Sequence, residues 1–395
     1  MTVDRNAPRS VSASSWLVER AADLVPMLMA QAPAAEQARR VSDASFDALS
    51  EAGIFLMTAP KRYGGAEADF QTQSEVLSHL ARGCPSTSWV ATIFSAMSWL
   101  AATFPDQAQE EMFADGDPRI SGVFSPTGTG VPKDGGLVVN GRWGFNTGCH
   151  GAKWTVLNAV VGTGADAVPT CVISRSRDLT IVDDWYATGM SATGSNTIVA
   201  DNVFVPAHRC LPLPDMLEAR LPPRHNSGNP YFNYPLSPVL TVNAGGTPIG
   251  MAQGALEGFL ARLPGRGIAY TFYTNKSEAP VTHLQVAEAR LTLESADAHV
   301  RMASALLDGH SGGPMSLDER VKSRAHIAYA MGLARQAVDT LFYASGASSI
   351  QTNVPIQRFQ RDVQALANHA IMHTQTALEL YGRILCGLPP NTPIY

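Results

Sequence analysis

Two histidines near the end of the chain stand four residues apart, at His369 and His373. In a helix, this spacing places both imidazoles on one face, where they could share a ligand. No third metal ligand is apparent in the sequence around them, so we predict no metal site. Taken alone, His369 and His373 are more typical of structural hydrogen-bonding residues in a helix bundle than of catalytic groups.

Three threonines stand beside glycines at the ends of predicted strands, at Thr127, Thr129 and Thr147. Their hydroxyl groups and the neighbouring backbone amides could be placed against a bound ring. For Thr127 and Thr129, the alternative is that the side chains only cap β-turns. Phe145 alternates with Trp143 along one predicted strand, so the alternative for both rings is a place in the core.

The composition predicts a globular protein that binds a small molecule. The chain has 395 residues, 45% of them hydrophobic, which is enough for two or three domains. Its formal charge of −5 provides no basic surface for nucleic acid or an anionic membrane. No apolar stretch is long enough to span a membrane, and Met1–Ser15 lacks the layout of a signal peptide. Five dispersed cysteines without a CxxC motif predict reduced thiols, and the lack of a membrane span and of a signal-peptide layout predicts a cytoplasmic location.

Changes in the apolar period divide the chain into three domains and a connector. Residues 1–115 have helical spacing and predict an N-terminal α-helical domain. Residues 116–210 alternate with a period of two and predict an antiparallel sheet or barrel. Residues 211–240 are rich in proline and predict a connector or surface lid. Residues 241–395 return to helical spacing and predict a four-helix bundle.

The expected elements follow from the same periods. The N-terminal helical stretches lie near residues 16–27, 41–54, 71–82 and 86–103. The six predicted strands are 120–125, 137–145, 154–161, 170–174, 179–183 and 196–205. The four long helices of the bundle are predicted at 249–263, 283–307, 317–344 and 355–385.

Several common catalytic motifs are absent from the sequence. Gly128-Thr129-Gly130 and Gly162-Thr163-Gly164 stop short of the GxGxxG string that opens a nicotinamide-binding helix. There is no GxxxxGK[ST], HExxH or GxSxG string either. Rossmann-type dehydrogenase, NTPase and hydrolase functions therefore lose their usual support.

The order of the domains and several short strings resemble the acyl-CoA dehydrogenase superfamily. Ala59-Pro60-Lys61-Arg62-Tyr63-Gly64-Gly65 resembles its P-x-x-Y-G-G turn, and Arg358-Phe359-Gln360-Arg361-Asp362 resembles its R-x-x-R-D segment. Four strings are similar to its two-component flavin-dependent monooxygenases, such as the 4-hydroxyphenylacetate and secosteroid phenol hydroxylases. These strings begin at Gly83, Ser125, Gly141 and Arg361, and they occur in the expected order.

This resemblance implies an α+β fold with an all-α N-terminal domain, a middle antiparallel β domain and a C-terminal long-helix bundle. It implies an oxygenase component that uses reduced flavin and O2, through a C4a-hydroperoxyflavin, to hydroxylate an aromatic or polyketide-like small molecule. Reduced FMN is favoured over reduced FAD by analogy, and a separate NAD(P)H:flavin reductase supplies it. The resemblance also implies a homotetramer and a water-poor cleft that holds the flavin N5 proton.

The resemblance assigns roles to residues of this chain. Thr147 occupies the family's serine position near the flavin, with Thr127, Thr129 and Phe145 as further cofactor contacts. His369 matches the family's histidine beside the hydroperoxide, where a near-neutral pKa would serve proton transfer. Arg266 resembles the arginine that binds the flavin phosphate, a task that suits a bidentate guanidinium. The alternative for Arg266 is a solvated loop residue.

The sequence departs from the phenol hydroxylases where a V-H-S-W segment supplies the histidine that activates the substrate. Here, Met97 replaces that histidine, and methionine cannot take a proton. Ser98 is then a candidate to hydrogen-bond the substrate, with Trp89 and Met97 as substrate contacts. His150 replaces an acidic residue of the family string and could compensate. These changes leave room for a larger aromatic or an amino-bearing substrate.

Three alternatives remain. An acyl-CoA dehydrogenase would need a catalytic glutamate soon after the R-x-x-R-D segment, where this chain has Ala367-Asn368-His369. Its base would have to be relocated, for example to Glu379, ten positions beyond His369. A related oxygenase could oxidise an amine instead of a ring carbon. A non-catalytic scaffold that has kept the fold is the third alternative.

Overall fold

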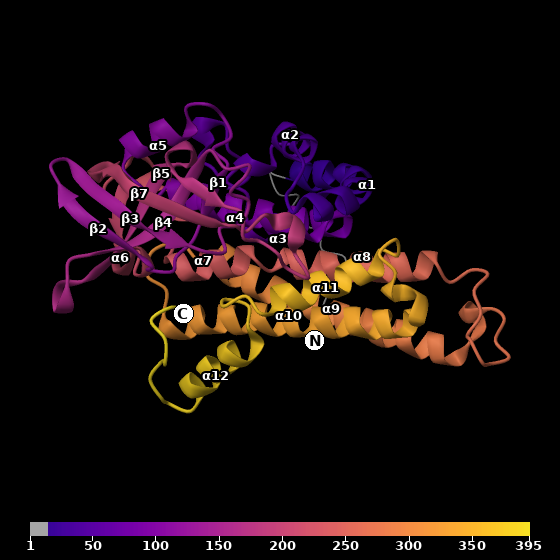
Figure 1. Ribbon diagram of the computed structural model, residues 1–395. Helices are drawn as coiled ribbons and strands as arrows, with labels where there is room; N and C mark the ends of the chain where they lie inside the picture. The colour runs from indigo at the N-terminus through magenta and orange to yellow at the C-terminus, as the bar shows by residue number, and fades with distance from the viewer. Residues whose placement is uncertain (1–14) are drawn as a thin grey trace.

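The structure is a computed structural model, and it describes residues 15–395. Figure 1 shows the β domain and the N-terminal helices side by side above the long C-terminal helices. This order of helices, sheet and helices confirms the predicted fold class. Residues 1–14 lie outside the described residues, and they make up most of the segment in which the sequence lacks a signal-peptide layout.

Within the described chain, the N-terminal part has five α-helices: α1 (Ser15–Ala38), α2 (Asp43–Glu51), α3 (Phe70–Gly83), α4 (Pro85–Ala101) and α5 (Asp106–Phe113). Helix α2 begins where the sequence predicts, since the Ser42 hydroxyl accepts a hydrogen bond from the Ser45 amide. Every residue of α4 except Ile93 is buried. Helix α4 therefore packs against both the β domain and the C-terminal helices. The two-turn α5 was not predicted.

The β domain is one mixed sheet of eight strands within residues 15–395, in the order β6-β7-β3-β2-β4-β5-β8, with β1 paired to β4. The strands are β1 (Ile120–Gly122), β2 (Gly128–Lys133), β3 (Gly136–Trp143), β4 (Trp154–Val161), β5 (Val168–Arg175), β6 (Thr180–Val182), β7 (Thr197–Pro206) and β8 (Cys210–Pro212). Alternating side chains such as Val139, Trp143 and Leu157 form its core.

The prediction of six strands in an antiparallel sheet or barrel differs from the structure in two respects. Strands β2 and β8 were missed, because Gly128, Gly130 and Pro132 are residue types that strands disfavour and β8 has only three residues. Strands β1 and β2 both pair with β4 in parallel. Side-chain alternation reports which face of a sheet a residue occupies, but not the direction of the neighbouring strand.

The proline-rich connector is anchored in the core, unlike a loose surface lid. It contains the short helix α6 (Leu213–Leu217) and leads into α7 (Leu236–Asn243). Phe232 is fully buried, and the Tyr234 hydroxyl lies 2.7 Å from the carbonyl oxygen of Leu307. These contacts tie the connector to the end of a long helix.

The C-terminal part contains α8 (Gly246–Ala261), α9 (Pro280–Asp308), α10 (Leu317–Ser345), α11 (Ile356–Ala367) and α12 (Thr374–Leu385). The prediction of one continuous helix over 355–385 is wrong, because a turn separates α11 from α12. The His373 side chain accepts a hydrogen bond from the Thr376 amide and caps α12. His369 lies in the turn, so His369 and His373 do not share a helix face.

Candidate active site

A chain of buried hydrogen bonds joins the turn after β3 to helix α11. The Thr147 and Ser195 hydroxyl oxygens are 2.9 Å apart, and those of Ser195 and Thr193 are 2.7 Å apart. The Thr193 hydroxyl donates to the Met190 carbonyl oxygen at 2.8 Å. The Met190 amide donates to Oδ1 of Asp362, in α11, at 2.5 Å. The predicted flavin contact Thr147 is thus connected to the R-x-x-R-D segment of α11.

Close backbone approaches hold this arrangement in place. Gly189, in the loop before β7, packs so tightly on α11 that a Cβ there would lie 2.2 Å from the Arg361 carbonyl oxygen. Gly148, next to Thr147, has a left-handed φ of 75° and packs against Phe94 and Val90 of α4. The Thr147 turn and the loop with Ser195 are therefore fixed by backbone packing as well as by hydrogen bonds.

Asp362 is a buried carboxyl group without an ion pair in the described chain. The neighbouring arginines bind a different acid, since Arg358 Nε lies 3.1 Å from Glu36 Oε2 and Arg361 also pairs with Glu36. Burial raises the pKa of Asp362 to about 7, although the hydrogen bond from the Met190 amide opposes that shift. The carboxyl group therefore changes its charge close to neutral pH.

Phe145 and Trp143 have different environments. Trp143 is a core residue, fully buried, and its indole N–H donates to the Asn158 carbonyl oxygen at 2.9 Å. Phe145 is 77% exposed, has a left-handed φ of 62°, and meets the Trp185 ring edge-on with the centroids 5.7 Å apart. A strained aromatic residue on the surface is typical of ligand sites. This placement fits the predicted cofactor contact for Phe145.

His369 lies against Trp89 of α4, with the two ring centroids 5.1 Å apart in an edge-on arrangement. Burial lowers the pKa of His369 to about 4, below the near-neutral value that the resemblance implies. Its buried Nδ1 atom has no hydrogen-bond partner among residues 15–395. A neutral imidazole with an unpaired ring nitrogen fits a site that a polar ligand completes.

Met97 and Ser98 differ in what they can offer to a substrate. The Met97 sulfur packs so closely on β1 that a Cβ on Gly122 would lie 2.5 Å from it. The Ser98 hydroxyl is fully buried and donates to the Phe55 carbonyl oxygen at 3.3 Å. That carbonyl competes with any substrate for the Ser98 proton. The substrate roles of Met97, Ser98 and Trp89 stay predictions.

The other predicted residues of the β domain have local partners. The Thr127 hydroxyl donates to the Arg142 carbonyl oxygen at 2.7 Å. The Thr129 hydroxyl lies 3.5 Å from the Asn140 carbonyl oxygen. These two bonds to carbonyl oxygens of β3 favour the alternative in which both threonines stabilise the local backbone. His150 is exposed, and its Nε2 lies 3.1 Å from Oδ1 of Asn196.

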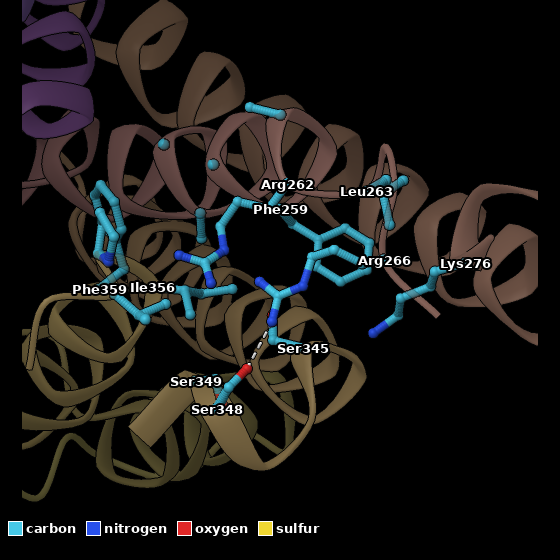
Figure 2. A pocket seen from close by; sticks show the side chains of 16 residues that line it. Phe259, Arg262, Leu263, Arg266, Lys276, Ser345, Ser348, Ser349, Ile356 and Phe359 are labelled. Carbon is cyan, nitrogen blue, oxygen red and sulfur yellow. Dashed lines mark hydrogen bonds between the residues drawn. The ribbon is translucent and has the colours of Figure 1, made fainter. Parts of the chain in front are cut away.

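Arg266 lines a cavity of about 280 Å³ between the end of α8 and the loop after α10 (Figure 2). Arg262 and Lys276 line the same cavity, and none of the three forms an ion pair with a carboxylate in the described chain. Arg266 Nη2 donates to the Ser348 hydroxyl oxygen at 2.9 Å, the dashed line in Figure 2. The Lys276 nitrogen lies 5.4 Å from the centre of the Phe259 ring. Three cations without counter-ions fit an anionic ligand such as a phosphate.

The cavity and His369 lie at opposite ends of α11. Ile356, the first residue of α11, lines the cavity, whereas His369 follows its last residue, Ala367. The 12 residues of α11 separate them by about 18 Å along the helix axis. The structure therefore does not bring Arg266 and His369 together within one chain.

Four further polar residues of these sites are not predicted from the sequence: Thr193, Ser195, Arg262 and Lys276. The segment Ser191-Ala192-Thr193-Gly194-Ser195-Asn196 carried a signal, since small hydroxyl residues around a glycine stand directly before a strand. Its role depends on contact with Thr147, 48 residues away in the sequence, which no local pattern reports.

Comparisons with known proteins define the class. Residues 17–115 match the family model described as "Acyl-CoA dehydrogenase, N-terminal domain", and residues 243–374 match "Acyl-CoA dehydrogenase, C-terminal domain". The chain belongs to the acyl-CoA dehydrogenase family, on the branch of the oxygenase components of two-component flavin-dependent monooxygenases. The predicted enzyme class and the predicted flavin cofactor are confirmed.

Particular relatives carry this assignment. The oxygenase subunit HsaA of a flavin-dependent monooxygenase from Rhodococcus jostii is 33% identical over 94% of this chain and 98% of its own length. The oxygenase component of an FADH2-dependent resorcinol hydroxylase from Rhizobium is 31% identical over 95% of each chain. The structure of XiaF from Streptomyces in complex with FADH2 and glycerol has a TM-score of 0.89 and 31% identity, covering 98% of this chain and 99% of its own.

Two further features describe the chain as a whole. None of the helices in residues 15–395 combines the length and apolar character required to cross a bilayer. Over the same residues, no three His, Cys, Asp or Glu side chains are grouped so that they could hold a metal ion. The five cysteines are free, and burial raises the pKa of Cys149 to about 11.

Proposed function

We propose that this protein hydroxylates a small aromatic or polyketide-like molecule, using a reduced flavin that a separate NAD(P)H:flavin reductase supplies. Bound reduced flavin supplies the electrons that activate O2, so that one oxygen atom enters the substrate and the other leaves as water. The observation that carries this proposal is the position of the exposed Phe145 ring two residues before the buried Thr147, in the turn after β3. An aromatic ring and a hydroxyl group are the kinds of side chain that bind a flat, mostly apolar ligand with a polar edge.

His369 is the proposed proton-transfer residue. As a neutral imidazole with an unpaired Nδ1, it can hold a proton shared with a ligand without charging the buried site. Trp89 fixes the orientation of its ring from one side. The turn between α11 and α12 places this imidazole at the end of the same helix that carries Asp362.

The dehydrogenase alternative finds no support at Glu379. This residue lies on α12, is exposed, and accepts a hydrogen bond from the Asn391 amide at 3.0 Å. A base that removes a substrate proton has to contact the bound substrate, whereas the exposed Glu379 is held by Asn391. Oxidation of an amine stays an alternative, since the same oxygen transfer can act on nitrogen.

We further propose a homotetramer in which the cationic cavity of one subunit serves the flavin of another. Arg266 lines the cavity at the start of α11 and His369 follows the end of that helix, yet the resemblance implies that both contact one flavin. The long helices expose apolar side chains suited to a subunit contact, including Leu284, Leu291 and Met302 of α9. Arg262, Arg266 and Lys276 would then bind the phosphate of a flavin whose ring lies on the neighbouring copy.

The proposed substrate class follows from α4. Met97 cannot deprotonate a phenol, so the substrate either brings an already electron-rich ring or is activated by another group. We keep both FMN and FAD as cofactors, because the resorcinol hydroxylase depends on FADH2 and XiaF binds it, whereas analogy favours FMN. A cytoplasmic location is part of the proposal, since the reductase draws on NAD(P)H.

The experiment that tests the function supplies the protein with a flavin reductase, NADH, FMN or FAD, and isotopically heavy O2. A panel of phenols, anilines and fused aromatic compounds is offered as substrate. Product that carries one heavy oxygen atom supports the proposal. Complete conversion of O2 to H2O2 with every compound, at saturating flavin, would contradict it.

A further inference from the structure

The hydrogen bonds behind Thr147 have only one consistent direction. A carbonyl oxygen cannot donate, so the Thr193 hydroxyl gives its proton to the Met190 carbonyl oxygen, 2.8 Å away. Thr193 can then only accept from Ser195, whose oxygen lies 2.7 Å away. Ser195, having used its proton, can only accept from Thr147 at 2.9 Å. The Thr147 proton therefore points inward.

The outward side of the Thr147 hydroxyl is consequently an acceptor. If the Thr147 proton pointed outward, no hydrogen would lie between the Thr147 and Ser195 oxygens. Thr147, Thr193 and Ser195 are all buried, so water could not supply the missing bond. Unpaired polar groups at such a position are costly. The Met190 end of the chain is fixed as well, because its amide is held by Asp362.

We propose that Thr193 and Ser195 are positioning residues that hold the Thr147 hydroxyl as an acceptor, so that the site selects reduced over oxidised flavin. Reduced flavin carries a hydrogen on N5 and can donate, whereas the N5 of oxidised flavin has only a lone pair. With oxidised flavin, the N5 lone pair would face the hydroxyl oxygen of Thr147, with no hydrogen between N5 and that oxygen. The inference rests on the proposed function, in which Thr147 lies beside the flavin ring.

This selection has a consequence for the catalytic cycle. If Thr147 accepts a hydrogen bond from the flavin, its hydroxyl would bind the flavin less tightly once N5 has no hydrogen to donate. The oxygenase component can then exchange spent flavin for reduced flavin from the reductase. The hydroxyl chain would therefore couple flavin exchange to the redox state of the flavin, without any movement of the backbone.

The test is the ratio of dissociation constants for oxidised and reduced flavin, measured anaerobically by ultrafiltration or fluorescence with FMN and with FAD. In the variant Ser195→Ala, the Thr147 proton is free to turn outward, so oxidised flavin becomes an acceptable partner. We expect the ratio to fall by about fivefold to tenfold, the effect of one hydrogen bond. Thr193→Val frees the Ser195 proton to turn toward Thr147 and should lower the ratio as well.

Two controls separate positioning from general structural damage. Thr193→Ser keeps the hydroxyl and should keep the wild-type ratio. Ser121→Ala removes another fully buried β-domain hydroxyl, 3.1 Å from that of Thr155, and should also keep the ratio. Thermal unfolding of each variant shows whether it is folded, and the nearly isosteric Thr193→Val decides the matter should Ser195→Ala not fold.

The outcomes distinguish the inference from the proposed function. A wild-type protein that prefers reduced flavin, with the same ratio in folded Ser195→Ala and Thr193→Val, would overturn the role of these two hydroxyls and leave the proposed function intact. Failure of the wild-type protein to bind either reduced flavin would overturn the proposed function, and the inference with it.

Discussion

The Met190 amide nitrogen lies 2.5 Å from Oδ1 of Asp362, so a buried carboxyl group of α11 holds the loop that carries Thr193 and Ser195. The same helix leads, seven residues later, to His369. One segment therefore positions both the hydroxyl chain behind Thr147 and the imidazole against Trp89. Asp362 is the residue through which the two halves of the candidate site are aligned.

Asp362 should make the protein less stable as the pH rises from about 4 to about 7. The folded protein keeps the proton of this carboxyl group up to its raised pKa of about 7, whereas the unfolded chain loses it near the ordinary value of 3.8. Stability from this group is therefore present at low pH and is lost toward neutral pH. Asp362→Asn keeps an acceptor for the Met190 amide but cannot ionise. Its melting temperature should therefore rise relative to that of the wild type as the pH increases from about 4 to about 7.

The quantity to compare at each pH is the difference in unfolding free energy between the wild type and Asp362→Asn. Burial lowers the pKa of His369 to about 4, which gives an opposite trend that destabilises the protein as the pH falls below about 6.5. That contribution is common to the wild type and Asp362→Asn and cancels in the difference. The expected difference is of the order of 4 kcal/mol at most. A difference that does not change between pH 4 and pH 8 would show that Asp362 is ionised throughout.

Gly189→Ala should destabilise the junction between the loop and α11. The added Cβ would lie 2.2 Å from the Arg361 carbonyl oxygen, so the backbone has to shift, at a cost of about 1–3 kcal/mol. Chemical denaturation measures this loss. The matched control is Gly382→Ala, within α12, where nothing lies within 4 Å of the new Cβ and helix propensity predicts a gain of about 0.5–1 kcal/mol. Equal stabilities of the two variants would refute close packing at Gly189.

His369→Asn should uncouple flavin oxidation from substrate hydroxylation. Without the imidazole, product formation should fall tenfold or more while H2O2 release rises, because proton transfer contributes at least that much in other enzymes. Product and peroxide are measured together in one assay with the reductase. His373→Asn is the control, since asparagine also caps a helix and His373 lies at the start of α12. Unchanged coupling in His369→Asn would remove that residue from the mechanism.

If two subunits together form each flavin site, oligomers that mix two inactive variants should recover activity. Arg266→Ala and His369→Ala should each be nearly inactive alone, since one lacks the phosphate contact and the other the imidazole. When the two are co-expressed, a subunit of each kind can combine its intact half with that of its neighbour. We expect up to about a quarter of the sites to be restored, if subunits mix at random. Activity no higher than that of the single variants, in verified mixed oligomers, would show that each chain forms its own site.

The sequence predicts the helices well where an apolar stripe packs on the core, as in α2 and α10. It fails at the turn of 368–373, because Ile371 and Met372 continue the apolar spacing while the cap by His373 ends the helix. Residue identity indicated Thr147 and His369, but not Ser195. The partner of a buried hydroxyl is decided by tertiary packing, here between segments 48 residues apart.

The most direct measurement of the central claim is an anaerobic titration of the wild-type protein with FMNH2, FADH2 and the two oxidised flavins. We predict saturable binding of at least one reduced flavin, tighter than that of its oxidised form, and slower formation of oxidised flavin when O2 is then admitted than in free solution. Absence of binding by both reduced flavins, or reoxidation at the rate of free flavin, would contradict the assignment of this site.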